Sequence, residues 1–185
     1  MTTKIQEKTS LKWSDVKKNI QEFNKDELLN LIKDLYDNSK ENKNFLNAKF
    51  CGNNRQSLEE YREKVIHPFF PKNKRFGDLK FAPAKKAIRD YKKATNDLLG
   101  TLDLMLTYVE SGTKFTLEYG DIDENFYNSL ETVLYEFSEL ISSKCKEYLE
   151  IFRERLEKLH KDAHWMGWGY GDTVDEVVSD LLRGK

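Results

Sequence analysis

Apolar side chains recur every three or four positions along most of the chain, which is the spacing of one face of an α-helix. The clearest example is residues 24–38, whose apolar positions are Leu28, Leu31, Ile32, Leu35 and Tyr36. Asn24 and Glu27 begin this segment in the N-x-x-E arrangement of a capping box. We therefore predict a helix over 24–38, with shorter helices over 14–22, 41–50 and 57–67.

Two segments in the middle of the chain predict helices with different surroundings. Residues 82–95 place small and apolar side chains on one side of a helix. The opposite side carries five cations, at Lys85, Lys86, Arg89, Lys92 and Lys93. Residues 98–109 are apolar almost all round, which is typical of a helix buried on most sides. We expect this central helix to end at Gly112, and residues 115–122 to form an extended link.

Beyond this link the pattern predicts one long helix. Apolar side chains keep a spacing of three to five residues from Phe126 to Leu159. Asp121 or Asp123 starts the helix, and a break is expected near Ser142. A pattern of this length favours a spine on which shorter helices pack, more than a seam between two chains.

The stretch 164–172, HWMGWGYGD, predicts a chain reversal followed by a last helix. A phosphate-binding loop follows a strand and carries a lysine, whereas here a helix precedes and no lysine follows. We expect Gly167 to end the long helix with a positive φ. Three rings are then expected to be buried, those of Trp165, Trp168 and Tyr170. The last helix begins at Thr173, where T-V-D-E matches a capping box.

Together these elements predict an all-α fold. Short N-terminal helical hairpins pack on a buried central helix and one long helix, with a C-terminal return helix. A chain of 185 residues can bury one substantial core, so we expect a single domain over residues 1–185. The three prolines, at 68, 71 and 83, indicate a hinge at 68–83.

Composition favours a folded protein in the cytoplasm. Apolar residues make up 38% of the chain and aromatic residues 12%, which is enough for a core built on large rings. No apolar run approaches the roughly 18 residues of a membrane helix, and the N-terminus lacks the pattern of a signal peptide. Cys51 and Cys145 are far apart, so we expect reduced thiols, and we expect no cofactor.

Three stretches of the chain are similar to those of a known family. They are DELLNLIKDLYDNSKENKNFL at 26–46, DLMLTYVESGTKFTLEYGDIDENFYNS at 103–129, and GWGYGD at 167–172. Together they resemble a family of small bacterial domains of unknown function, over most of residues 14–180. The resemblance implies an all-helical bacterial domain. It implies no catalytic residue, because the family has no assigned activity.

Charge is distributed unevenly along the chain. Residues 1–100 hold 22 Lys and Arg against 14 Asp and Glu, whereas residues 101–185 hold 9 against 18. The strongest bias lies in residues 62–93, with 11 bases against 3 acids. Such asymmetry is typical of a surface for nucleic acid or an acidic partner, but it also occurs when two segments of one fold neutralise each other.

Residues 62–93 therefore contain a candidate site for nucleic acid or an acidic partner. Lysine and arginine neutralise phosphates, and aromatic rings stack on unpaired bases. The candidate residues are Arg75, Lys80, Lys85, Lys86, Arg89, Lys92, Lys93, Phe76 and Phe81. The alternative is a face that is only solvated, or paired with the nine acids of residues 101–142.

His160 and His164 form a candidate metal site, because residues four apart share one face of a helix. Lys161 stands where the H-E-x-x-H motif needs glutamate, which excludes a metalloprotease of that class. Asp172, or Glu176, is the candidate third ligand. Alternatively, the two histidines only cap the C-terminus of the helix.

The chain is best explained as a non-enzymatic helical interaction protein that binds a protein partner or associates with itself. Two alternatives follow from the candidate sites. One is a nucleic-acid-binding protein that uses the basic face of residues 62–93, and the other is a metal-dependent enzyme at His160 and His164.

Overall fold

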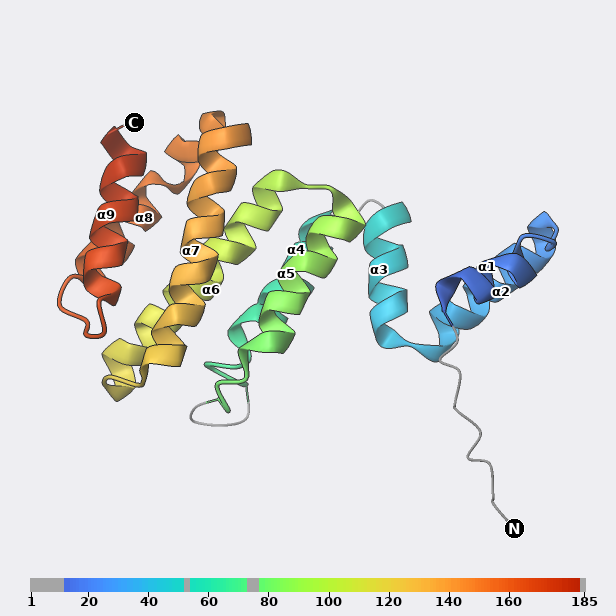
Figure 1. The fold of residues 1–185 in the computed structure, drawn as a ribbon, viewed down its shortest axis with the longest axis horizontal. Coiled ribbons are helices and arrows are strands. Elements are labelled where there is room, and N and C mark those ends of the chain that lie inside the picture. The colour runs from blue at the N-terminus through green and yellow to red at the C-terminus, as the bar shows by residue number, and fades with distance from the viewer. Residues whose placement is uncertain (1–11, 52–53, 73–76, 184–185) are drawn as a thin grey trace, which may run out of the picture. The chain divides into compact units, whose positions relative to one another are not determined.

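The computed structural model describes residues 12–51, 54–72 and 77–183. These residues form α-helices and one short 3₁₀ helix, with no strand among them, which confirms the all-α prediction (Figure 1). Contacts between residues divide the chain into two compact units, Met1–Leu46 and Asn47–Lys185. No helix of the described residues is long and apolar enough to cross a membrane.

The N-terminal unit contains α1 (Trp13–Ile20), α2 (Lys25–Asn38) and the start of α3 (Lys40–Phe50). The predicted capping box at α2 is confirmed. Asn24 Oδ1 accepts hydrogen bonds from the backbone N–H groups of Asp26 and Glu27, at 2.9 and 3.0 Å. Glu27 Oε2 in turn accepts from the backbone N–H of Asn24 at 2.7 Å. These bonds satisfy donors that the first turn of a helix leaves free.

In the described residues, the C-terminal unit contains the end of α3 and six further α-helices, one of which is central. They are α4 (Asn54–Ile66), α5 (Phe81–Thr95), α6 (Leu98–Tyr119), α7 (Glu124–Lys144), α8 (Leu149–Ala163) and α9 (Tyr170–Arg183). Helix α6 packs against α4, α5, α7 and α8, while α9 packs on α7 and α8 (Figure 1). The predicted central helix is therefore confirmed, as is the return helix.

An aromatic cluster forms one end of the core of this unit. Phe69 lies at its centre, with ring centroids 5.4 Å from Tyr108, 6.3 Å from Phe126 and 6.5 Å from Phe115. Phe69, Tyr108 and Phe126 are almost fully buried. Rings of this size remove much apolar surface from water, so a polar chain can still hold a stable core.

Helix α6 is longer than predicted, because Gly112 does not end it. The helix continues to Tyr119, and residues 115–119 are helical where an extended link was expected. Gly112 is buried, and a Cβ atom there would overlap the side chain of Leu130 in α7. The glycine thus lets two helices approach closely, and this packing outweighs its low helix propensity.

The long helix predicted up to Leu159 is two helices. Helix α7 begins after its N-cap Asp123, as expected, but ends at Lys144. Cys145 has φ −141° and ψ 36°, outside the helical region, and a short 3₁₀ helix, η1 (Lys146–Tyr148), leads into α8. The break lies two residues beyond the serines at 142 and 143. Cys145 is buried at this corner, so the change of direction forms part of the core.

The turn between α8 and α9 also differs from the prediction. Positive φ angles occur at Trp168 (58°) and Gly169 (78°), whereas Gly167 has none. Helix α9 begins at Tyr170, before the predicted start at Thr173. Tyr170 is buried, as expected, and its hydroxyl lies 2.7 Å from Thr113 Oγ1. The two tryptophans of this turn, in contrast, lie at the surface.

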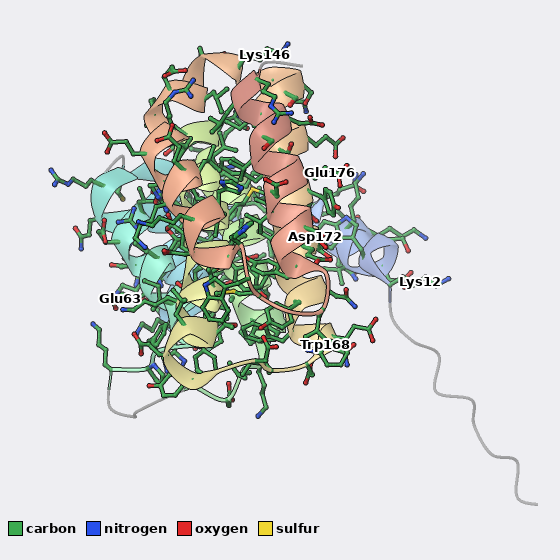
Figure 2. The ribbon with its side chains drawn as sticks, turned by 90° about the vertical axis from the view of Figure 1, so that its left-hand side faces the viewer. Lys12, Glu63, Lys146, Trp168, Asp172 and Glu176 are labelled. Atoms are coloured by element: carbon green, nitrogen blue, oxygen red, sulfur yellow. The ribbon has the colours of Figure 1, made fainter. Side chains whose placement is uncertain are left out.

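Trp165 is 67% exposed, so the prediction that it is buried was wrong. The same holds for Trp168, which is 57% exposed (Figure 2). The segment expected to be a hinge is described only in part. On either side of residues 73–76, backbone hydrogen bonds join Gly77 to Phe69 at 2.7 Å and Leu79 to Pro68 at 3.2 Å. The hinge and the single domain stay predictions.

Candidate functional site

Helix α5 has the two faces that its sequence predicts. The side chains on its apolar face are buried, at Ala84, Ala87, Ile88, Tyr91 and Ala94. On the other side Lys86, Arg89, Lys92 and Lys93 are exposed, and Lys85 is half-buried. We call Lys85, Arg89, Lys92 and Lys93 the basic face of α5. Their spacing of i, i+4, i+7 and i+8 aligns them along the helix.

The basic face of α5 is not neutralised by the acids of residues 101–142. In the part of the chain that the structure describes, none of its four cations forms a salt bridge. Lys86 pairs with Asp90 of the same helix at 2.5 Å, and Lys80 pairs with Asp78 at 3.4 Å. Internal pairing therefore does not account for the basic face.

The aromatic members of this candidate site are placed differently. Phe81 belongs to the aromatic cluster, with ring centroids 5.4 Å from Phe69 and 5.6 Å from Phe126. Most of its ring surface is thus covered by the core, which leaves little for stacking on a base. Arg75 and Phe76 lie outside the described residues.

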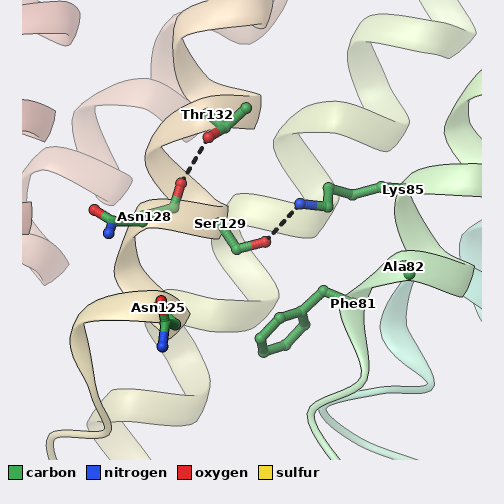
Figure 3. A pocket seen from close by; sticks show the side chains of 7 residues that line it. All are labelled: Phe81, Ala82, Lys85, Asn125, Asn128, Ser129 and Thr132. Atoms are coloured by element: carbon green, nitrogen blue, oxygen red, sulfur yellow. Dashed lines mark hydrogen bonds between the residues drawn. The ribbon is translucent and has the colours of Figure 1, made fainter.

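A shallow hollow lies between α5 and α7, beside the basic face (Figure 3). It has a volume of about 400 Å³ and is lined by Phe81, Ala82, Lys85, Asn125, Asn128, Ser129 and Thr132. Lys85 and Ser129 point toward each other across it, and Lys85 Nζ donates a hydrogen bond to Ser129 Oγ at 3.0 Å (Figure 3). Ser129 Oγ lies 2.8 Å from the buried hydroxyl of Tyr108. Lysine, serine and tyrosine therefore form a chain from the surface into the core.

The candidate metal residues are not gathered at one place. His160 Nε2 lies 2.7 Å from Asp175 Oδ1, and the ring of His164 is 6.3 Å from that of His160. Asp172 is exposed in the first turn of α9 (Figure 2). Across residues 12–51, 54–72 and 77–183, no group of three or more His, Cys, Asp and Glu side chains is placed to hold a metal ion. A carboxylate partner for His160 thus exists, but it is Asp175.

The apolar stripe of α2 lies at the surface of the N-terminal unit. No side chain of the described residues 12–46 is buried. Leu28 is 37% exposed, Ile32 45% and Leu35 49%. These three side chains follow one another at four- and three-residue spacing, and we call them the apolar face of α2. Further large apolar side chains are exposed in this unit at Trp13, Val16, Phe23 and Leu29.

A family model described as a family of unknown function, DUF6155, matches residues 11–181. This match covers most of the chain. The chain belongs to the DUF6155 family. The resemblance to a family of unknown function is thereby confirmed. Membership in DUF6155 does not assign an activity to the chain, because the family is one of unknown function. Neither a curated protein nor a solved structure matches the chain.

A polar cluster joins three helices of the C-terminal unit, and all of its residues lie within the range that matches DUF6155. Arg155 in α8 forms a bidentate salt bridge with Glu110 in α6, with nitrogen–oxygen distances of 2.8 and 2.6 Å. Arg62 in α4 bonds to Asp103 in α6. Burial disfavours the charge of Arg155, but its bonds to Glu110 and Asp103 outweigh this effect and raise its pKa.

The sequence predicted neither this polar cluster nor the contact between Ser129 and Lys85. Arg155 lies 45 residues from Glu110, and Lys85 lies 44 residues from Ser129. The spacing of residues within one helix does not indicate contacts between residues so far apart in the sequence. The one available signal was the charge imbalance between the two halves of the chain, for which contact between acids and bases within the fold was one of two explanations.

Proposed function

We propose that the protein is a non-enzymatic interaction protein that binds a protein partner through the apolar face of α2. The observation that carries this proposal is the exposure of Leu28, Ile32 and Leu35, each between a third and a half accessible to water. Contiguous exposed apolar side chains on one helix are typical of a surface that another helix covers. An isolated exposed leucine would carry no such meaning.

The charges around the apolar face of α2 favour a basic helix as the partner. Helix α2 carries four acids, Asp26, Glu27, Asp34 and Asp37, against two lysines, Lys25 and Lys33. Lys33 is engaged with Asp37 at 2.5 Å. A second copy of the chain would bring the same acids to the interface, and like charges there oppose association. The complementary partner is an amphipathic helix whose apolar stripe is flanked by lysine and arginine.

The proposal can be tested with synthetic helices. One fluorescent peptide carries a leucine stripe flanked by lysine, and its counterpart carries the same stripe flanked by glutamate. We expect the lysine peptide to bind at least tenfold more tightly than the glutamate peptide. Each buried leucine or isoleucine contributes about 1.5–3 kcal/mol, so Ile32→Glu with Leu35→Glu should weaken binding by about 100-fold or more. Fluorescence anisotropy measures both effects.

The matched control is Ile151→Glu in α8, since Ile151 is 58% exposed and lies in the other unit. If I151E and I32E/L35E bind the lysine peptide with equal affinity, the apolar face of α2 is not the binding surface. Analytical ultracentrifugation of the chain alone provides the second measurement. A dimer that I32E/L35E dissociates would show that a second copy, and not a basic helix, covers this face.

A second candidate function is binding of an anionic polymer, such as nucleic acid, on the basic face of α5. The observation in its favour is that Arg89, Lys92 and Lys93 are exposed and form no salt bridge within the described residues. Anisotropy of labelled DNA and RNA at several salt concentrations tests it, because neutralised phosphates give a steep decrease of affinity with salt.

The informative variant is Arg89→Glu with Lys92→Glu, because Lys86 already has Asp90 as a partner. Its control is Lys18→Glu with Lys161→Glu, which reverses the same charge at exposed sites on other helices. Binding that decreases equally in both variants would indicate attraction by net charge alone. Loss confined to R89E/K92E would support a site on α5.

A further inference from the structure

The hollow between α5 and α7 is rich in hydrogen-bond donors and contains a single charge. Among its seven lining residues only Lys85 has a basic or acidic side chain. The others are two asparagines, a serine, a threonine, an alanine and a phenylalanine. Lys85 is half-buried, and no carboxylate among the described residues forms a salt bridge with it. A partly desolvated ammonium group without a counter-ion is unfavourable unless another group compensates its charge.

The hydrogen bonds of Ser129 determine where its own proton points. The hydroxyl of Tyr108 is buried, and Ser129 Oγ is its partner at 2.8 Å. A buried hydroxyl donates its hydrogen where an acceptor is available, so Tyr108 donates to Ser129. Lys85 can only donate, and it also donates to Ser129. Ser129 Oγ thus accepts two hydrogen bonds, which leaves its own O–H free for a third group.

Several donors therefore face the same open space. Lys85 uses one N–H on Ser129 and keeps two, and Ser129 keeps its O–H. Asn125 and Asn128 also line the hollow, but their side-chain amides point away from Lys85 and Ser129 (Figure 3). Thr132 donates to the backbone carbonyl of Asn128 at 2.7 Å, so its hydroxyl proton is already engaged. Donors with one positive charge and no lining acid match an oxyanion.

We propose that the hollow between α5 and α7 binds a phosphate-type oxyanion, with Lys85 and Ser129 as its main ligands. The volume of about 400 Å³ accommodates a phosphate group with an attached substituent. The phosphate belongs either to a small molecule or to the backbone of a nucleic acid, since both present the same oxygens. This site lies in the C-terminal unit and does not depend on the apolar face of α2.

The test is an NMR titration of the full chain with inorganic phosphate, with chloride adjusted to hold the ionic strength constant. We expect saturable shifts of the backbone amides of Asn128 and Ser129. Lys85→Met removes the charge and leaves the pair of Ser129 and Tyr108 in place, so its fold can be verified by circular dichroism. Loss of a charged hydrogen bond should weaken binding at least about tenfold.

Lys86→Met is the matched control, because Lys86 is the next residue of α5, is exposed, and pairs with Asp90 outside the hollow. Its affinity for phosphate should equal that of the unmodified chain within twofold. Shifts that do not saturate, or equal affinities for K85M and K86M, would overturn the site.

A short labelled single-stranded oligonucleotide identifies the source of the phosphate. If K85M weakens both phosphate and oligonucleotide binding, the hollow binds a phosphate of the nucleic-acid backbone. If K85M weakens phosphate binding alone, the ligand is a small phosphate compound. Oligonucleotide binding that depends on Lys85 without any saturable phosphate binding would overturn the oxyanion site.

Discussion

Nη1 of Arg155 in α8 lies 2.6 Å from Oδ1 of Asp103 in α6, and the other oxygen of the same carboxylate bonds to Arg62 in α4. One carboxylate thus links three helices of the C-terminal unit. All of these side chains are at least two-thirds buried. Nε of Arg62 is buried and has no partner among the described atoms, so the pairing is incomplete on that side.

Replacing Asp103 by alanine should lower the free energy of unfolding by about 1–3 kcal/mol, because two partly buried guanidinium groups lose a charged acceptor. Urea unfolding followed by near-UV circular dichroism measures the change. Glu157→Ala is the control, since Glu157 is exposed and lies 3.9 Å from Arg153. Its effect should stay below about 0.5 kcal/mol. Equal effects would mean that the cluster adds nothing to stability.

Gly112→Ala should destabilise the protein although alanine is the better helix former. The new Cβ would overlap the buried side chain of Leu130, and overpacking costs about 1–3 kcal/mol, against a gain of up to about 1 kcal/mol in helix propensity. Urea unfolding checks the sign. Combining G112A with Leu130→Ala should cost less than the sum of the two single changes, because the smaller side chain frees the space.

Ser129→Ala should destabilise more than Tyr108→Phe. The first change leaves the buried tyrosine hydroxyl without its acceptor, at a cost of about 1–3 kcal/mol, whereas the second leaves Ser129 bonded to Lys85. The double variant S129A/Y108F removes both polar groups and should be more stable than S129A alone. Thermal and urea unfolding of the three variants measure the order, and S129A as the most stable of them would show that the bond between Ser129 and Tyr108 does not stabilise the fold.

Stability should decrease in alkaline solution above pH 10. Burial, with a hydrogen bond to Asp121, raises the pKa of Tyr127 from 10.0 to about 12. The neutral phenol is therefore favoured in the folded state. Its contribution is fully present below pH 10, the pKa in the unfolded chain, and is lost as the pH rises toward 12.

The change that isolates this effect is Tyr127→Phe. At neutral pH the variant should be less stable by about 1 kcal/mol, because it lacks the bonds of the hydroxyl to Asp121 and Thr116. The difference from the unmodified chain should shrink as the pH rises above 10, since phenylalanine does not ionise. Urea unfolding over this range provides the test, and a constant difference would mean that Tyr127 ionises equally in both states.

The two thiols should differ sharply in reactivity. Both are free, but Cys51 is exposed while Cys145 is buried at the corner between α7 and α8. Burial raises the pKa of the Cys145 thiol, which lowers the fraction of reactive thiolate. A disulfide reagent such as DTNB should modify one thiol per folded chain, and none in Cys51→Ser. Rapid modification of that variant would show that the corner opens.

Structural features that depend only on residues within one or two turns of the same helix were predictable from the sequence. The capping box of Asn24 and Glu27, the N-cap Asp123 and the buried face of α5 all follow from local spacing. The end of α6 and the start of α9 did not follow. Gly112 is held in a helix by its approach to α7, and Tyr170 is placed by a contact with Thr113, 57 residues away.

The same distinction applies to the candidate sites. Helical spacing was enough to predict that Arg89, Lys92 and Lys93 share an exposed face. It did not predict that Ser129 faces Lys85, or that Phe81 turns into the core, since both depend on how α5 lies against α7. A pattern of charges and rings indicates a composition, but tertiary packing decides which of its members reach the surface.

The packing of each helix against its neighbours in the sequence has a consequence for how the chain folds during its synthesis. In the C-terminal unit each helix packs mainly against the next helix or the next but one, as in the pairs α4 and α5, α6 and α7, and α8 and α9. Contacts between segments close in sequence allow folding on the microsecond to millisecond scale. We therefore expect these hairpins to form one after another as the chain leaves the ribosome, with Tyr170 closing on Thr113 last.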